Sequence, residues 1–313
     1  MKVAIIGRSE ILYNCAITVL EKGHTIALVV TSKETPEYKV TSKDFEELAS
    51  EIGAEYIYTP KINEEAILNK IEKLGEIDIA ISINYSGIIS NEVIDCFKLG
   101  ILNAHGGDLP RYRGNACQSW ALINGETRIG LCIHKMIGSE LDSGDIIERS
   151  YLKVDINTRI GEVYQWIEEE TPTRMFDAIQ KLSSDKNYVL EKQSKKPSKA
   201  LRCYPRKPED GKINWNCSAE DILRLINASS EPFSGAFSDF ENEKIIIWRA
   251  EILIDNENYL AIPGQVCLID HNSNCIIVIT RSGKLKITEI EFKGERCNPN
   301  TVIKSIRKRL GTF

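Results

Sequence analysis

The sequence predicts an α/β protein in which a Rossmann-like, mostly parallel sheet is followed by a small, OB-like β-barrel. In the N-terminal half, short apolar runs alternate with segments of helical period, a pattern typical of parallel sheets covered by helices. In the C-terminal third, closely spaced strand-like runs are separated by turn residues, which is typical of a small barrel. A chain of 313 residues is also long enough for two domains. We therefore expect one domain at residues 1–195 and a second at 196–313.

The N-terminal elements follow from hydrophobic periodicity. Helices are expected at Ile11–Lys22, Lys43–Ile52 and Glu64–Leu74. The strands between them are expected at Lys2–Ile6, Thr25–Thr31, Tyr56–Tyr58, Ile77–Ile83 and Ile101–Asn103. Right-handed crossovers between such strands give a Rossmann-like sheet.

The pattern changes from Gly130 onward. Two strands are expected at Ile129–Met136 and Asp145–Val154, and a long helix at Glu162–Leu182. The segment Lys192–Lys207 contains seven Lys or Arg residues, two prolines and no acidic residue, and we interpret it as an interdomain linker. Beyond it we expect one helix, Ala219–Ser229, and strands at Lys212–Trp215, Glu243–Ile254, Gln265–Ile269, Cys275–Thr280 and Lys284–Phe292.

Composition excludes several classes of protein. A net charge of −5 argues against a dedicated nucleic-acid binder, which usually carries a basic excess. The nine cysteines are odd in number, scattered and without a C-x-x-C pair, so we expect reduced thiols in a cytoplasmic protein and no structural metal. No stretch approaches the ~18 apolar residues of a membrane span, and Arg8 and Glu10 interrupt the first apolar run.

The first strand-to-helix turn, Gly7-Arg8-Ser9-Glu10, has one glycine where a dinucleotide fingerprint needs three. A nicotinamide cofactor is therefore not expected. Arg8 and Ser9 are candidates for contacting an anionic substrate at a helix N-terminus. The alternative is an ordinary turn in which Ser9 caps the helix.

Three polar residues are candidates for catalysis. A strand is expected to end at Asn103, and His105 lies in the loop just beyond its carboxyl end, where open α/β sheets place their ligands. Alternation along an extended segment puts Asn103 and His105 on one side. Asp142 follows on a turn-rich loop, Ser139–Asp145. Each residue alone also has a structural explanation, such as an Asx turn at Asp142.

The surrounding motifs make the set specific. Asn103-x-His105 is followed by Leu109-Pro110-x-Tyr-Arg113-Gly114, His134-Lys-Met136 and Leu141-Asp142-x-Gly144-Asp145, and this array closely resembles the folate-dependent formyltransferase family. The resemblance implies Asn103, His105 and Asp142 as the catalytic set. One departure is Gly107-Asp108-Leu109-Pro110, where relatives usually have Ser-Leu-Leu-Pro; another is Asn115-Ala-Cys117.

The residue types suit formyl transfer. An amine attacks the formyl carbon and produces an oxyanion, which the Asn103 amide and a His105 N–H can stabilise. His105 suits proton transfer near neutral pH, and Asp142 would orient it. The resemblance implies N10-formyltetrahydrofolate as donor and no metal. It places the pterin against two loops, with contacts from Asn84, Tyr85, Ser86, Gly87, Ile88 and Leu141.

The acceptor is expected to be a UDP- or dTDP-linked amino sugar for a surface glycan. The segment from Leu201 onward resembles the C-terminal domain of two family branches, which formylate nucleotide-linked amino sugars or methionyl-tRNA. The segment Thr31–Asp44 has no surplus of positive charge with which to bind tRNA phosphates. The basic linker Lys192–Lys207, in contrast, would suit tRNA binding. Candidate contacts to a sugar nucleotide are Arg8, Ser9, Arg113, Arg202 and Arg206. A formyltetrahydrofolate hydrolase is a further alternative, and a homodimer is the family-level expectation.

Overall fold

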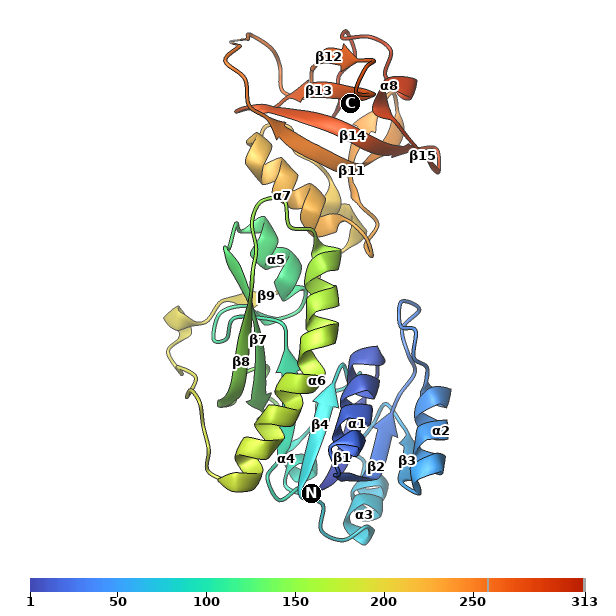
Figure 1. Ribbon diagram of the computed structural model, residues 1–313, viewed down its shortest axis with the longest axis vertical. Helices are drawn as coiled ribbons and strands as arrows, with labels where there is room; N and C mark the ends of the chain where they lie inside the picture. Colours follow the sequence, from blue (N-terminus) through green and yellow to red (C-terminus); the bar gives the residue numbers. More distant parts are fainter. Residues whose placement is uncertain (258, 312–313) are drawn as a thin grey trace. The chain divides into compact units, whose positions relative to one another are not determined.

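The computed structural model describes residues 1–257 and 259–311 (Figure 1). These residues form two compact units. The first contains Met1–Gly114, Gly130–Leu152 and Gln165–Arg202, and the second contains Asn115–Ile129, Lys153–Tyr164 and the residues from Cys203 onward. Each unit is made of several segments that alternate along the chain. The prediction of two domains with a boundary between residues 195 and 196 stays a proposal.

The first unit contains a seven-stranded sheet with the order β3-β2-β1-β4-β5-β7-β8. The pairs among its first five strands are parallel, whereas β5 and β7 are antiparallel. The strands are β1 (Lys2–Gly7), β2 (Thr25–Thr31), β3 (Glu55–Tyr58), β4 (Ile79–Ile83), β5 (Ile101–His105), β7 (Arg128–Lys135) and β8 (Ile146–Lys153). The predicted Rossmann-like, mostly parallel sheet is confirmed.

Helices cover both faces of this sheet because its strands are apolar on both sides. On β1, Val3 and Ile5 face one hydrophobic core and Ala4 and Ile6 face the other. The first core includes residues of α1 (Glu10–Glu21), α2 (Ser42–Ile52) and α6 (Ile160–Ser184), and the second includes residues of α3 (Glu65–Lys73) and α4 (Asn91–Ile94).

The strand order reverses at β1, which lies between β2 and β4. Open α/β sheets bind ligands beyond the carboxyl ends of their strands at such a switch point. Gly7 is required there, because a Cβ atom on it would lie 1.9 Å from the Ile83 carbonyl oxygen at the end of β4. The backbone amide of Arg8 donates to the same oxygen at 3.1 Å, which joins the two strand ends.

The second unit is built on an antiparallel sheet with the order β10-β11-β14-β13-β12, and β15 pairs with β14. Helix α7 (Ala219–Ser229) contributes to its core beside Trp215, whose indole N–H donates to Ser238 Oγ at 2.9 Å. The strands are β10 (Ala236–Phe240), β11 (Glu243–Leu253), β12 (Val266–Asp270), β13 (Cys275–Ile279), β14 (Lys284–Phe292) and β15 (Glu295–Cys297).

Short elements account for most differences from the predicted secondary structure. The segment Lys212–Trp215, predicted as a strand, makes only an isolated bridge from Lys212 to Phe237. Unpredicted elements are α4, α5 (Cys117–Ile123), β6 (Arg113–Gly114), β9 (Arg202–Cys203), β10, β15, α8 (Pro299–Val302) and the 3-10 turns Pro197–Lys199 and Pro208–Gly211. Among the residues that the structure describes, none of the helices is long and apolar enough to cross a membrane.

Candidate active site

The antiparallel pair of β5 and β7 brings Asn103 and His134 together. The two residues lie directly opposite each other in the strand register, and opposite residues in a sheet point to the same face. The distance from Asn103 Nδ2 to His134 Nε2 is 3.0 Å. His134 belongs to the motif that carries the family resemblance, but its position beside Asn103 depends on this register.

His134 fixes the orientation of the Asn103 amide. Its Nδ1 lies 2.9 Å from the Lys135 carbonyl oxygen, which can only accept, so Nδ1 carries the proton of the neutral ring. Nε2 is then an acceptor, and Asn103 donates to it. This arrangement uses one amide hydrogen of Asn103 and leaves the second available for a ligand.

His105 is buried, and each of its ring nitrogens faces an acceptor. Nε2 donates to the carbonyl oxygen of Tyr112 at 2.6 Å, and Nδ1 lies 3.5 Å from Asp142 Oδ2. The neutral ring can donate to only one of these acceptors, whereas the imidazolium can donate to both. The imidazolium form of His105 would therefore satisfy both acceptors, whereas the neutral ring leaves one of them unpaired.

Asp142 lies between the two histidines. Its Oδ1 is 3.6 Å from His134 Nε2, and its Oδ2 accepts a hydrogen bond from the Gly114 amide at 2.9 Å. The backbone of Asp142 has φ 51°, in the left-handed region that residues other than glycine adopt at an energetic cost. Asp142 also bonds outside its own loop, so it is more than a local Asx turn.

The buried charges shift the pKa values of this pair. Burial lowers the pKa of His105 below 6.5, against the opposing effects of Asp142 and the Tyr112 carbonyl, while His134 and Arg113 lower it further. Burial raises the pKa of Asp142, but the two histidines and the Gly114 amide outweigh it and hold that pKa at about 2. At neutral pH the site therefore holds an Asp142 carboxylate beside a neutral His105.

The loop Gly107–Pro110 is adapted to this arrangement. A Cβ atom on Gly107 would lie 2.5 Å from His105 Nε2 and 2.4 Å from the Tyr112 oxygen. Asp108 forms an ion pair with Arg149, whose guanidinium also donates to the Leu109 carbonyl oxygen at 2.8 Å. The departures from the usual family loop thus make room for His105 and anchor the loop to β8.

Arg8, Ser9 and Asn84 meet at the switch point of the sheet. Arg8 donates to the Asn84 carbonyl oxygen at 2.8 Å and to the Lys33 carbonyl oxygen at 2.6 Å. Ser9 precedes α1 but makes no capping hydrogen bond, and its hydroxyl instead accepts from the Asn84 amide at 3.3 Å. The simple-cap interpretation of Ser9 is therefore wrong.

The predicted folate loop Asn84–Ile88 contains one half-buried aromatic residue and one exposed apolar residue. The Tyr85 hydroxyl donates to the Thr59 carbonyl oxygen at 2.9 Å, and the Ser86 hydroxyl lies 2.8 Å from that of Ser32. Gly87 lies against the Pro60 carbonyl, where a Cβ atom would approach to 3.2 Å. Ile88 has 73% of its surface exposed.

Leu141, in the second predicted folate segment, is also exposed (47%), as is Ile137 (39%). Asn91, at the start of α4, accepts from the Gly138 amide at 3.0 Å. A Cβ atom on Gly138 would lie 2.5 Å from Asn91. This close contact holds the segment of Ile137 and Leu141 to the element that follows Ile88.

The other three predicted arginines differ in their surroundings. Arg113 donates to Gln193 Oε1 at 2.7 Å. Arg202 is exposed. Arg206 donates to the carbonyl oxygen of Ala228 at 3.2 Å, at the end of α7, and burial lowers its pKa. Of the three, Arg202 is the most accessible to solvent.

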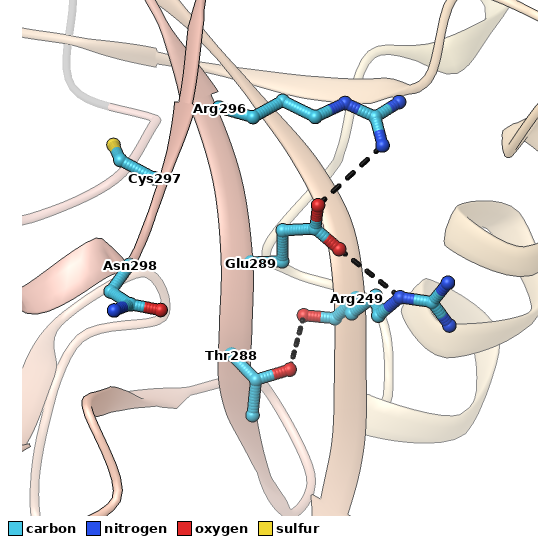
Figure 2. A pocket seen from close by; sticks show the side chains of 6 residues that line it. All are labelled: Arg249, Thr288, Glu289, Arg296, Cys297 and Asn298. Atoms are coloured by element: carbon cyan, nitrogen blue, oxygen red, sulfur yellow. Dashed lines mark hydrogen bonds and ion pairs between the residues drawn. The ribbon is translucent and has the colours of Figure 1, made fainter.

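A cavity of about 480 Å³ lies in the second unit and is lined by none of the predicted site residues. Figure 2 shows Arg249 and Arg296 on either side of Glu289. The distance from Arg249 Nε to Glu289 Oε2 is 3.1 Å, and that from Arg296 Nη1 to Glu289 Oε1 is 3.5 Å. Thr288, Cys297 and Asn298 complete the lining. Glu289 pairs with both arginines, so the two positive charges of the lining share one negative charge. Across residues 1–257 and 259–311, no group of three or more His, Cys, Asp or Glu residues is placed to hold a metal ion.

The first unit thus combines a Rossmann-like sheet with a cluster of an amide, two imidazoles and a carboxylate. The protein belongs to the formyl transferase family: residues 1–179 match the family model described as formyl transferase, and residues 206–307 match the formyl transferase C-terminal domain. The predicted family membership and enzyme class are thereby confirmed.

Relatives with different functions share this architecture. The chain is 29% identical over 311 residues to the bifunctional polymyxin resistance protein ArnA of Wigglesworthia glossinidia brevipalpis, covering 95% of the chain and 44% of that protein. The chain therefore spans less than half the length of this relative.

Two solved structures share the fold at low sequence identity. An N-formyltransferase from Helicobacter canadensis, solved with folinic acid and dTDP-3-aminofucose, superposes with a TM-score of 0.68 at 17% identity over 92% of this chain and 98% of its own. A methionyl-tRNA formyltransferase from Clostridium thermocellum gives 0.53 at 18% identity over 81% and 94%.

Proposed function

We propose that this protein is an N-formyltransferase that moves a formyl group from N10-formyltetrahydrofolate to the amine of a UDP- or dTDP-linked amino sugar used in surface glycans. The observation that carries the proposal is the cluster of Asn103, His105 and Asp142 at the carboxyl end of β5. An amide donor, a neutral imidazole and a carboxylate are the groups that metal-free acyl transfer to an amine requires.

The proposed donor site lies along Asn84–Ile88 and the segment of Ile137 and Leu141. Exposed Ile88, Ile137 and Leu141 would supply apolar surface for the flat pterin ring, and backbone groups of both segments would supply its hydrogen bonds. The hydrogen bond between Asn91 and Gly138 supports this assignment because it ties the second segment to α4, close to the first in sequence.

In the proposed reaction, the amine nitrogen of the acceptor bonds to the formyl carbon, and the carbonyl oxygen becomes an oxyanion that the free Asn103 amide hydrogen stabilises. The amine proton passes to Nδ1 of neutral His105, next to Asp142. The imidazolium then donates to both Tyr112 and Asp142. When the bond from the formyl carbon to N10 breaks, His105 returns the proton to N10, which restores the neutral ring.

Charge supports a sugar nucleotide as the acceptor. In the segment Thr31–Asp44, three lysines are balanced by Glu34, Glu37 and Asp44. Glu34 accepts a hydrogen bond from the Ser42 amide at 3.2 Å, and Asp44 accepts one from the Thr41 amide at 2.7 Å. A loop that binds tRNA phosphates needs a surplus of positive charge. The Helicobacter relative, solved with a dTDP-linked amino sugar, points the same way.

Methionyl-tRNA is the second candidate acceptor, favoured by the basic segment Lys192–Lys207 and by the Clostridium relative. Incubation of the protein with formyltetrahydrofolate and a panel of UDP- and dTDP-amino sugars, with methionyl-tRNA as a parallel acceptor, followed by mass spectrometry, separates the two. A gain of one formyl group on a sugar supports the proposal, whereas formylation of tRNA alone refutes the sugar assignment. Formate release without an acceptor would indicate a hydrolase.

The nine free thiols fit the proposed cytoplasmic location.

A further inference from the structure

The segment Leu190–Arg202, which we call the strap, includes most of the predicted basic linker Lys192–Lys207. Its backbone is bound to the first unit at both ends. Near one end, the amide of Ile146 donates to the Glu191 carbonyl oxygen at 2.9 Å, and the amide of Glu191 donates to the Ile146 carbonyl oxygen at 3.1 Å. Near the other end, the amide of Arg113 donates to the Leu201 carbonyl oxygen at 2.9 Å. The strap is therefore an ordered part of the unit that contains the catalytic cluster.

Gln193 is the one buried residue of the strap, with 8% of its surface exposed, while its flanking lysine residues are exposed. Its side-chain amide donates to the carbonyl oxygens of Asp142 at 2.9 Å and Gly144 at 2.7 Å. Its own oxygen accepts from Arg113 at 2.7 Å. Both polar groups of the Gln193 side chain are thus directed to residues around the Asp142 loop.

These contacts restrain Asp142 from two directions. Gln193 holds its backbone, which has the unfavourable φ of 51°, and the Gly114 amide holds its carboxylate at 2.9 Å. Arg113, adjacent to Gly114, also binds Gln193, so one short segment supports both restraints. A backbone in a sparsely populated conformation persists only where surrounding contacts hold it.

The geometry points to Gln193 as a positioning residue for formyl transfer: it locks the Asp142 loop so that the carboxylate faces Nδ1 of His105. This inference rests on the proposed function. It also assigns Arg113 to the support of Gln193, in addition to any contact with substrate. The strap thereby acts in catalysis through its single buried amide, independently of its positive charge.

Two substitutions test whether Gln193 positions the Asp142 loop. Gln193→Ala removes all three hydrogen bonds, whereas Gln193→Glu keeps the size and the acceptor for Arg113 but replaces the donor by a carboxylate facing two carbonyl oxygens. We expect kcat to fall by about 10- to 100-fold in both, because a shift of about 1 Å in a catalytic group has effects of that size, with KM for both substrates within about threefold. Ser198→Ala, an exposed residue of the strap, is the matched control and should retain wild-type kcat.

The second readout is independent of turnover. The chain has four histidines, so the imidazole signals of 13C-labelled protein can be followed by NMR as a function of pH. His105 faces Asp142, His134, Arg113 and the Tyr112 carbonyl, and of the charged groups only Asp142 raises its pKa. Displacement of Asp142 in Gln193→Ala should therefore move the titration of His105 to lower pH than in the wild type. Gln193→Glu is judged by kcat alone, because it adds a negative charge of its own.

A lower kcat in both folded variants, with a downshifted His105 titration in Gln193→Ala, would support the inference. Unchanged kcat in both variants and an unchanged titration in Gln193→Ala would overturn it and leave Gln193 a packing residue. If the wild-type protein formylated no acceptor, the proposed function would fail, but the titration would still decide whether Gln193 positions Asp142.

Discussion

Gly144 is expected to be essential for the geometry of the active site. A Cβ atom at this position would lie 1.8 Å from the carbonyl oxygen of Lys135 in β7, whereas an ordinary contact needs at least 3.4 Å. The substitution Gly144→Ala therefore forces the Asp142 loop and β7 apart by about 1.5 Å. A displacement of about 1 Å in a catalytic group can cost 100-fold in rate, so we expect kcat to fall by at least that factor. Steady-state formyl transfer at saturating substrates measures it.

Loss of stability must be separated from this effect. Gly23→Ala is a suitable control, because Gly23 has φ 82° and, apart from its chain neighbours, no described residue has an atom within 4 Å of its Cβ position. It should cost about 1 kcal/mol through backbone strain and leave kcat unchanged. Urea unfolding and circular dichroism report stability and folding of both variants. A folded Gly144→Ala protein with kcat within threefold of wild type would refute the steric reasoning.

Three further predictions concern the cluster and its loop. Asn103→Ala, His105→Ala and Asp142→Ala should each lower kcat by about 10²- to 10⁴-fold while folate still binds, as judged by fluorescence titration; near-wild-type turnover of His105→Ala would exclude His105 as the proton carrier. Because burial lowers the pKa of His105, kcat/KM should fall only as the pH drops through a value below 6.5. Asp142→Asn should move this limb to lower pH, since Asp142 raises that pKa, and a limb moved to higher pH would contradict the assignment. Arg149→Met leaves Asp108 without its ion-pair partner and should lower the free energy of unfolding by about 3 kcal/mol in urea denaturation; a loss below 1 kcal/mol would show that the pair does not anchor the loop.

The parts of the fold with strong hydrophobic periodicity were predictable. Strands such as Thr25–Thr31 and Lys284–Phe292 have the predicted bounds, because their apolar runs end at clear turn signals. Elements such as β6 and β9, with two residues each, carry no periodic signal. The strand predicted at Lys212–Trp215 fails because Trp215 is buried in a core while its backbone remains outside the sheet.

The candidate site was predictable as far as motif spacing reaches. Asn103, His105 and Asp142 follow from the motif, and the structure brings them together. The positions of His134 and Gln193 depend on facts that spacing does not contain: the antiparallel register of β5 and β7, and the return of the strap to the Asp142 loop. A basic, proline-containing segment predicts a solvated linker, because one buried amide leaves no mark on its composition.

Transfer of the formyl group itself tests the central claim most directly. The protein is incubated with N10-formyltetrahydrofolate and either the amino-sugar nucleotide panel or methionyl-tRNA, and the products are identified by mass spectrometry, with His105→Ala in parallel. We predict that one sugar nucleotide gains a formyl group on its amine and that His105→Ala forms far less of this product. Formylated methionyl-tRNA with every sugar unmodified, or formate released with no acceptor present, would contradict the assignment as a sugar-nucleotide N-formyltransferase.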